Sequence, residues 1–202
     1  MISYAICVCN EHQELKNLLE FLQETKNEND EIVILVDSKK ENKLVSSVIG
    51  LFHNNVKVFT RSFDGDFAAH KNYLNSCCSG DIIFNIDADE IPQEGLMKVV
   101  NDFSNNEDFD VLYVPRINIC PGYTQEFINK HKFNVNEMGL INWPDYQGRI
   151  YKKGVQWEGK VHEKPNGKNI KLLPASTQLA LWHVKSVSKQ NKQNDLYNNI
   201  QE

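Results

Sequence analysis

The chain has 202 residues, of which 41% are hydrophobic, with 10 glycines and 6 prolines. This length is enough for one sizeable hydrophobic core and short for two, so we expect a single domain over residues 1–202. The formal net charge of -5 argues against a protein whose main task is to cover nucleic acid, because phosphate backbones require a clustered excess of Lys and Arg.

The apolar segments and the cysteines indicate in which cellular compartment the protein is expected. No apolar run approaches the roughly 18 residues of a membrane span, and the N-terminus has neither a basic leader nor a small-residue cleavage site. The five cysteines form neither a CxxC pair nor a zinc-ligand spacing. We therefore expect a cytoplasmic protein with reduced thiols and no transmembrane segment, for which peripheral attachment to a membrane stays open.

Strand and helix patterns alternate through the first half of the chain. The spacing of apolar residues predicts strands at 3–9, 32–36, 56–59, 82–86 and 111–115. It predicts helices over 11–25, 44–51 and 67–74, and a fourth that begins near Pro92 and extends to about 103. Such alternation implies right-handed crossovers and a largely parallel sheet with helices on both faces.

The alternation stops after Pro115. Residues 117–144 mix proline and glycine with aromatic side chains, a composition that predicts a long loop of the kind that often binds ligands. Further along, the sequence predicts short strands at 149–152, 155–158 and 179–183 and a polar helix from about 186 to the end.

Three carboxylates follow the fourth predicted strand, at Asp87, Asp89 and Glu90. Because side chains alternate along a strand, we expect Asp87 and Asp89 to point to the same side, where they repel each other unless a cation lies between them. Hard oxygen ligands favour Mg²⁺ or Mn²⁺ over zinc. In an open α/β sheet, ligands bind outside the carboxyl ends of the strands. The residues indicate a metal-assisted enzyme that acts on a diphosphate.

Other short motifs accompany these carboxylates in a characteristic order. They are Ile6-Cys7-Val8-Cys9-Asn10-Glu11, Val36-Asp37-Ser38, Asp66-Phe67-Ala68-Ala69-His70-Lys71-Asn72, Asp87-Ala88-Asp89-Glu90, Arg149-Ile150-Tyr151-Lys152, Trp157-Glu158-Gly159-Lys160-Val161-His162-Glu163 and His183. By their order and spacing the chain resembles, over nearly its whole length, the family 2 glycosyltransferases of the GT-A fold. The resemblance is greatest to the branch that includes lipopolysaccharide-core and bacteriocin-peptide glycosyltransferases.

The resemblance implies a fold and a division of the chain. The GT-A fold is a Rossmann-like α/β domain with a mixed, mainly parallel sheet flanked by helices. Residues 1–115 would form the nucleotide-binding half, and residues 116–202 the acceptor-side half.

The resemblance also implies a donor site. In such enzymes the first loop and the aspartate after the second strand hold the base and the ribose, which places Asn10, Glu11 and Asp37 around a uracil-like ring. An alternative role for Asp37 is to cap the next helix, and the two roles can coexist. The resemblance implies that Asp87 contacts either the ribose or a residue that binds the metal.

Two basic residues are implied to meet the donor phosphates. Lys71 stands where many relatives carry arginine, so it offers a point charge without the bidentate fork of a guanidinium group. Arg149 either assists the phosphates or pairs with a carboxylate. Three aromatic residues are candidates to stack on a sugar, or else belong to the core: Trp143, Tyr146 and Trp157.

The resemblance implies Asp89 and His183 as ligands of a Mn²⁺ or Mg²⁺ cofactor that bridges the donor diphosphate. A hydrogen-bonded core histidine is the alternative for His183. Inverting transfer also needs a general base near the acceptor hydroxyl, and the family places an acidic residue where Glu163 stands. Many relatives have a Glu-Asp pair there, so both His162 and Glu163 are candidates, with Glu163 preferred. The alternative for Glu163 is a surface ion pair with Lys160 or Lys164.

The expected function is a metal-dependent, inverting transfer of a sugar from a nucleotide-diphosphate donor, UDP-linked, to a hydroxyl of a glycan, a lipid-linked sugar or a protein. Phosphotransferases of the haloacid dehalogenase type carry DxD on their first strand, whereas this chain has it on the fourth. A sugar-nucleotide pyrophosphorylase needs a glycine-rich basic loop after its first strand, unlike Asn10-Glu11-His12. A catalytically silent nucleotide- or carbohydrate-binding module of the same fold is the other reading.

Overall fold

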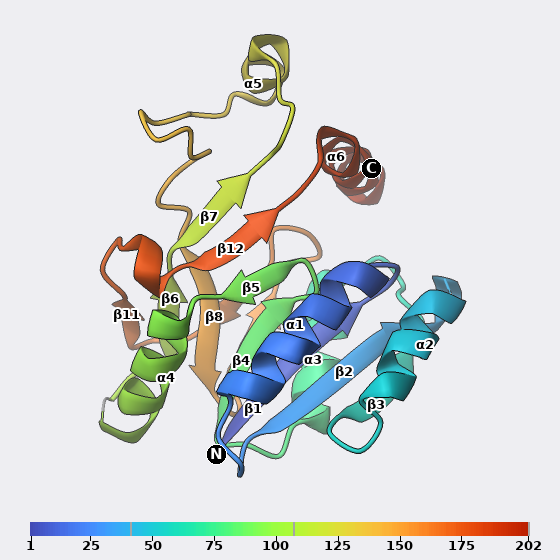
Figure 1. The fold of residues 1–202 in the computed structure, drawn as a ribbon, viewed down its shortest axis with the longest axis vertical. Helices are drawn as coiled ribbons and strands as arrows, with labels where there is room; N and C mark the ends of the chain where they lie inside the picture. Colours follow the sequence, from blue (N-terminus) through green and yellow to red (C-terminus); the bar gives the residue numbers. More distant parts are fainter. Residues whose placement is uncertain (41, 107, 202) are drawn as a thin grey trace.

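A seven-stranded sheet forms the centre of the computed structural model, which describes residues 1–40, 42–106 and 108–201 (Figure 1). The strand order is β11-β6-β8-β4-β1-β2-β3. Strand β8 runs antiparallel to β4 and β6, and the other four pairings are parallel. The strands are Ile2–Val8 (β1), Glu31–Asp37 (β2), Lys57–Arg61 (β3), Ile82–Asp87 (β4), Val111–Val114 (β6), Gln147–Lys152 (β8) and Ile170–Leu172 (β11). This confirms the mixed, mainly parallel α/β sheet.

Helices cover both faces of this sheet, as predicted. They are α1 (His12–Thr25), α2 (Lys43–Leu51), α3 (Phe67–Cys77) and α4 (Glu94–Asn106). Because side chains alternate along β1, Tyr4 and Ile6 join the core beneath α1, α2 and α4, whereas Ala5 joins the core beneath α3. The predicted strands and helices of residues 1–115 are therefore confirmed, with boundaries that differ by a few residues.

A second, three-stranded sheet has the order β5-β12-β7 and consists of Glu90–Pro92 (β5), Leu181–Val184 (β12) and Arg116–Ile119 (β7). The expected place of Pro92 in the first turn of a helix is wrong. Pro92 is instead paired with Leu181 at the end of β5, and α4 begins at Glu94. Strand β5 is at the edge of its sheet, where a residue without an N–H group is tolerated.

The region 117–144 is more regular than the predicted loop. It begins within β7 and contains helix α5 (Gln125–His131), whose first turn is capped by the Thr124 hydroxyl. The alternation of polar Arg116 and Asn118 with Ile117 and Ile119 is a strand pattern that was overlooked amid the prolines and glycines.

The remaining elements are a two-stranded sheet, two short turns and a C-terminal helix. Strands β9 (Gln156–Glu158) and β10 (Lys164–Asn166) form an antiparallel pair whose connecting loop carries His162 and Glu163. Two single-turn 3₁₀ helices are present at Ser38–Lys40 and Thr177–Leu179, and helix α6 spans Val187–Gln201. All five cysteines are free thiols. Of the helices in the described ranges, none is both long enough and apolar enough to cross a membrane.

Candidate active site

A cavity of about 1140 Å³ opens where strands β1, β2 and β4 end. The residues that the sequence assigns to the donor site, the metal and the base all line this cavity, although they come from distant parts of the chain. They are Asn10, Glu11, Asp37, Lys71, Asp87, Asp89, Arg149, His162, Glu163 and His183. The fold therefore brings the predicted site residues to one place.

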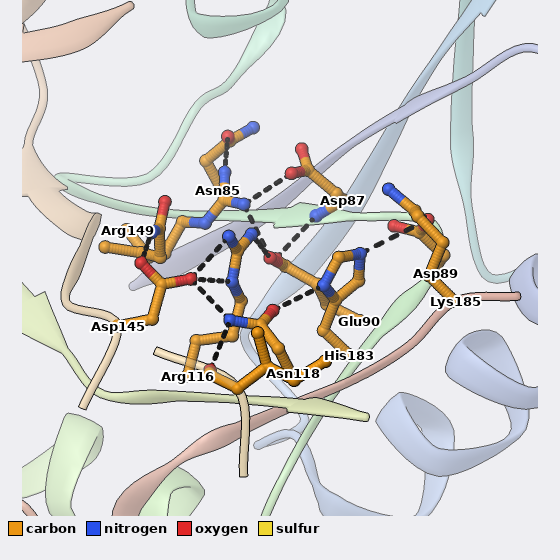
Figure 2. A network of polar contacts seen from close by, with 12 residues as sticks. Asn85, Asp87, Asp89, Glu90, Arg116, Asn118, Asp145, Arg149, His183 and Lys185 are labelled. Carbon is orange, nitrogen blue, oxygen red and sulfur yellow. Dashed lines mark hydrogen bonds and ion pairs between the residues drawn. The ribbon is translucent and has the colours of Figure 1, made fainter. Parts of the chain in front are cut away.

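The two aspartates of the DxD motif have different partners (Figure 2). Strand β4 ends at Asp87, so Asp89 lies in a turn and the expected alternation along one strand does not apply to the pair. Asp87 forms ion pairs with Arg149 and, at 3.8 Å, with Lys71. Asp89 Oδ2 lies 3.6 Å from His183 Nε2 and 3.4 Å from Lys185 Nζ. Each carboxylate thus has its own cationic or imidazole neighbours.

Arg149 pairs with carboxylates, which is one of the two roles expected for it. Its buried guanidinium group contacts both Asp87 and the fully buried Glu90, at 2.6 Å from Glu90 Oε1. Burial alone would raise the pKa of Asp87, but the charges of Arg149 and Lys71 outweigh it and hold that pKa well below its ordinary value. The Asp87 carboxylate is therefore ionised throughout the physiological pH range.

The network extends into the second half of the chain through residues that the sequence reasoning missed. Arg116 donates to Glu90 Oε1 at 2.9 Å and to Asp145 Oδ2 at 2.7 Å (Figure 2). Asn118 donates to the same Asp145 oxygen at 2.7 Å and lies beside His183. The alternation of polar and apolar residues in β7 was the available signal, because it places Arg116 and Asn118 on one face.

Glu163 forms a buried ion pair. Its Oε1 lies 2.9 Å from Lys71 Nζ, and the Lys71 ammonium lies 4.1 Å from the centre of the Trp157 ring. The alternative of a surface pair with Lys160 or Lys164 is therefore wrong, because the tertiary fold supplies a more buried partner. The Lys71 and Glu163 side chains are only 7% and 13% exposed, so the pair is largely shielded from water.

The neighbouring His162 has a left-handed backbone, with φ 55°, and its ring packs edge-on against Tyr197. Non-glycine residues rarely adopt this conformation, and it is frequently found at functional sites. Gly159, with φ 96°, opens the same turn. The two candidate bases thus lie in one tight loop at the wall of the cavity.

Asp37 both caps a turn and lines the cavity. Its Oδ1 accepts hydrogen bonds from the backbone N–H groups of Lys39 and Phe63, each at 3.0 Å. Asp37 thus caps the 3₁₀ turn Ser38–Lys40, whereas the next helix, α2, is capped by Asn42, so the alternative of a cap for that helix is wrong. Asp37 Oδ2 faces the Cys9 thiol at 3.9 Å. One oxygen is thus held by the backbone, while the other contacts the thiol of Cys9, which also lines the cavity.

The loop that follows β1 is held in place by the side chain of Glu11. Glu11 Oε2 accepts hydrogen bonds from the backbone N–H groups of Cys9 and Asn10. The Asn10 side chain is exposed. Phe63, Phe67 and His70 also line the cavity. Phe67 and His70 belong to a motif quoted from the sequence, where they had no role, and Phe63 was not singled out. Aromatic side chains there offer flat surfaces for a planar ligand.

The three aromatic candidates for sugar stacking differ in their environment. Trp157 is 5% exposed and donates to the Tyr151 hydroxyl, so it belongs to the core as well as to the cavity floor. Tyr146 lines the cavity and donates to the Leu173 carbonyl. Trp143 is not among the described residues that line the cavity.

Solved structures with a similar fold include S. aureus TarS 1-349 in complex with UDP-GlcNAc and in complex with UDP. The first is 15% identical, with a TM-score of 0.62, and the match covers 91% of this chain and 58% of that one. The second is 15% identical, with a TM-score of 0.63, and the match covers 98% of this chain and 64% of that one. The chain thus spans about three fifths of those TarS structures. At this identity the likeness shows the fold, which is GT-A.

No curated protein sequence is significantly similar to the chain. The family model described as "Glycosyl transferase family 2" matches residues 3–161, which is well over half of the chain. That match includes the DxD motif, Lys71, Arg149 and the first turn of the loop that leads to Glu163. The chain therefore belongs to glycosyl transferase family 2.

Proposed function

We propose that the protein transfers a sugar from a nucleotide-diphosphate donor, of the UDP-sugar class, to an acceptor hydroxyl, with a divalent metal and with inversion at the anomeric carbon. The observation that carries this proposal is the presence, in one cavity, of the Asp89–His183 pair and of the carboxylate of Glu163. The two groups suit the two ends of the reaction, because the departing diphosphate needs positive charge and the attacking hydroxyl needs a base.

The residues at Asp89 fit a hard divalent cation. Asp89 Oδ2 and His183 Nε2 lie 3.6 Å apart, and these two atoms would hold the ion. Within the described ranges, no group of three or more His, Cys, Asp or Glu side chains is arranged to hold a metal. Two protein ligands are enough for Mg²⁺ or Mn²⁺, because these ions commonly take further oxygens from substrate phosphates and water. When bound, the ion would supply Lewis acidity to the leaving diphosphate.

The positive side chains around this pair favour an anionic ligand. Lys185 adds an ammonium group 3.4 Å from Asp89, and Lys189 and Lys192 of α6 also line the cavity, Lys189 in an ion pair with Glu14. The cations Arg149 and Lys71 neutralise Asp87, so the motif as a whole does not repel a diphosphate. TarS has been solved with UDP-GlcNAc and with UDP, which supports a uridine donor for a chain of the same fold.

Glu163 is the preferred base. Its carboxylate lines the cavity and is oriented by Lys71, whereas His162 packs against Tyr197. Glu163 would take the proton of the acceptor hydroxyl while that oxygen attacks the anomeric carbon opposite the leaving diphosphate. The acceptor-side half, residues 116–202, provides the remaining cavity wall. The acceptor that this half would bind is a glycan, a lipid-linked sugar or a protein side chain.

The test is nucleotide release from UDP-, GDP- and nucleoside-diphosphate-heptose donors, with and without Mn²⁺. The wild type is compared with Asp89→Asn, which keeps the size of the side chain. The matched control is Asp81→Asn, at the opposite end of the same strand, where the side chain is 90% exposed.

We expect metal-dependent release of one nucleotide, its loss in Asp89→Asn, and unchanged release in Asp81→Asn. Full activity of Asp89→Asn at saturating donor would overturn the metal assignment. No release from any donor, together with no thermal stabilisation by any donor, would favour the catalytically silent binding module.

A further inference from the structure

His183 lies in the middle of a row of polar residues that crosses the three-stranded sheet. In the register of that sheet, Glu90 of β5 is its antiparallel partner on one side and Asn118 of β7 is its parallel partner on the other. All three side chains enter the same network (Figure 2). His183 is 8% exposed, so its ring is surrounded by protein on nearly every side.

The orientation of the Asn118 amide follows from its neighbours. Asp145 Oδ2 receives hydrogen bonds from Arg116 Nε at 3.0 Å and from Arg116 Nη2 at 2.7 Å, and Gln147 donates to Asp145 Oδ1 at 2.8 Å. An ionised carboxylate can only accept hydrogen bonds. The Asn118 group 2.7 Å from Asp145 is therefore the NH₂ group, and the Asn118 oxygen faces His183.

The protonation of Asp145 supports this orientation. Burial alone would raise its pKa, but Arg116 and the hydrogen bond from Asn118 outweigh that effect and lower it. Asp145 therefore carries no proton to donate to Asn118 near neutral pH. The Asn118 amide also donates to the Ile141 carbonyl at 3.4 Å, a second acceptor on the same side.

The Asn118 oxygen in turn decides which nitrogen of His183 carries hydrogen. His183 Nδ1 lies 2.7 Å from Asn118 Oδ1, which only accepts, so Nδ1 is the protonated nitrogen of the neutral ring. Nε2 then has its lone pair, and it lies 3.6 Å from Asp89 Oδ2, another acceptor. Asp89 Oδ2 also faces the Lys185 ammonium at 3.4 Å, whereas the lone pair of Nε2 would be left for a bound cation.

We propose that Asn118, oriented by Asp145, is a positioning residue that fixes His183 in the Nδ1–H tautomer and so presents the Nε2 lone pair toward Asp89. Its importance for the reaction rests on the proposed function, in which His183 is a metal ligand. In metal sites generally, the partner of the second ring nitrogen sets the tautomer and the orientation of the ring, and its removal weakens metal affinity 10- to 100-fold.

The first test measures the tautomer directly, in metal-free protein without donor. Nitrogen-15 NMR of histidine-labelled protein at mildly alkaline pH distinguishes a protonated ring nitrogen from a bare one, and the His183→Gln variant identifies the resonances of His183. We expect Nδ1–H in the wild type. In Asn118→Leu, which has a similar volume and no hydrogen-bonding group, we expect a mixture of tautomers or the Nε2–H form. Nε2–H in the wild type would overturn the proposal without recourse to any variant.

The second test is a titration with Mn²⁺ in the presence of UDP, followed by electron paramagnetic resonance. We expect Asn118→Leu to bind Mn²⁺ about 10- to 100-fold more weakly than the wild type. The matched control Asn27→Leu removes an amide that contacts Asp30 and Asn101 and does not line the cavity, so it should leave the Mn²⁺ affinity unchanged. Equal loss in both variants would contradict the positioning role.

The two proposals can fail separately. If the wild type shows the Nδ1–H tautomer and Asn118→Leu loses it, while no protein binds Mn²⁺, then the positioning role stands and the metal assignment of the proposed function falls. If the wild type binds Mn²⁺ and transfers the sugar, and Asn118→Leu binds Mn²⁺ with the same affinity, then the proposed function stands and the positioning role falls.

Discussion

Lys71 Nζ lies 2.9 Å from Glu163 Oε1. The same ammonium group lies 3.8 Å from Asp87 Oδ1, so one buried cation joins the candidate base to the first aspartate of the DxD motif. A lysine expected to meet a phosphate thus contacts carboxylates in the structure. Through Lys71, the position of the base is coupled to the end of strand β4, which is also where the donor would be held.

The first prediction separates the two candidate bases. Glu163→Gln keeps the shape of the side chain and removes its basicity, so kcat should fall by about 10²- to 10⁴-fold. His162→Gln should lower kcat by less than about tenfold, because His162 packs against Tyr197. Steady-state kinetics of both variants check this. Binding of UDP, measured by calorimetry, should stay unchanged in each. A larger loss in His162→Gln would assign the base to His162.

The second prediction concerns recognition of the nucleobase by Asp37. Asp37→Asn keeps an oxygen for the N–H groups of Lys39 and Phe63, and puts an NH₂ group in place of the Oδ2 that contacts Cys9. Uracil presents an N–H at ring position 3, whereas cytosine presents a lone pair there. The affinity for UDP should therefore fall about tenfold, and the ratio of the CDP affinity to the UDP affinity should rise. Calorimetry with both nucleotides checks the change. An equal loss for UDP and CDP would indicate a purely structural role for Asp37.

The third prediction concerns stability. Arg149→Met removes the buried partner of the fully buried Glu90 and one partner of the partly exposed Asp87, so the free energy of unfolding should fall by about 3–5 kcal/mol, mostly through Glu90. The matched control on the same strand is Lys152→Met, whose pair with Asp108 is exposed and should contribute less than about 1 kcal/mol. Urea unfolding of both variants measures the difference. Similar small losses in the two variants would mean that the buried network contributes little to folding.

The fourth prediction is a pH dependence of stability at Glu31, far from the cavity. Burial raises the pKa of Glu31, but hydrogen bonds from Lys57, Ser3 and Ser79 outweigh it and lower the pKa from 4.5 to about 2. Because the folded pKa lies below the unfolded one, the ionised carboxylate stabilises the fold fully above pH 4.5. That stabilisation should disappear as the pH falls toward 2.

The measurement is the difference in unfolding free energy between the wild type and Glu31→Gln, followed from pH 7 to pH 2. We expect about 1–2 kcal/mol at neutral pH and almost none at the acid end. Glu20→Gln removes an exposed i,i+4 pair with Lys16 and should show little difference at any pH. A difference for Glu31→Gln that does not change with pH would contradict the assignment.

Local patterns in the sequence predicted the first half of the fold well. The strands and helices of residues 1–115 follow from apolar periodicity, which depends only on near neighbours along the chain. Pro92 was misplaced because proline suits both a first helical turn and the edge of a sheet. Its pairing with Leu181 decides between them, and that pairing joins distant segments.

The α/β alternation, the acidic motif at the end of a buried strand and, through resemblance, the family can all be read from short segments and from their order. The pairing of Lys71 with Glu163, the contact of Arg149 with both Asp87 and Glu90, and the neighbours of His183 became visible in the folded chain alone. Strand register and the sharing of buried charge depend on segments far apart in the chain, so no local periodicity specifies these contacts.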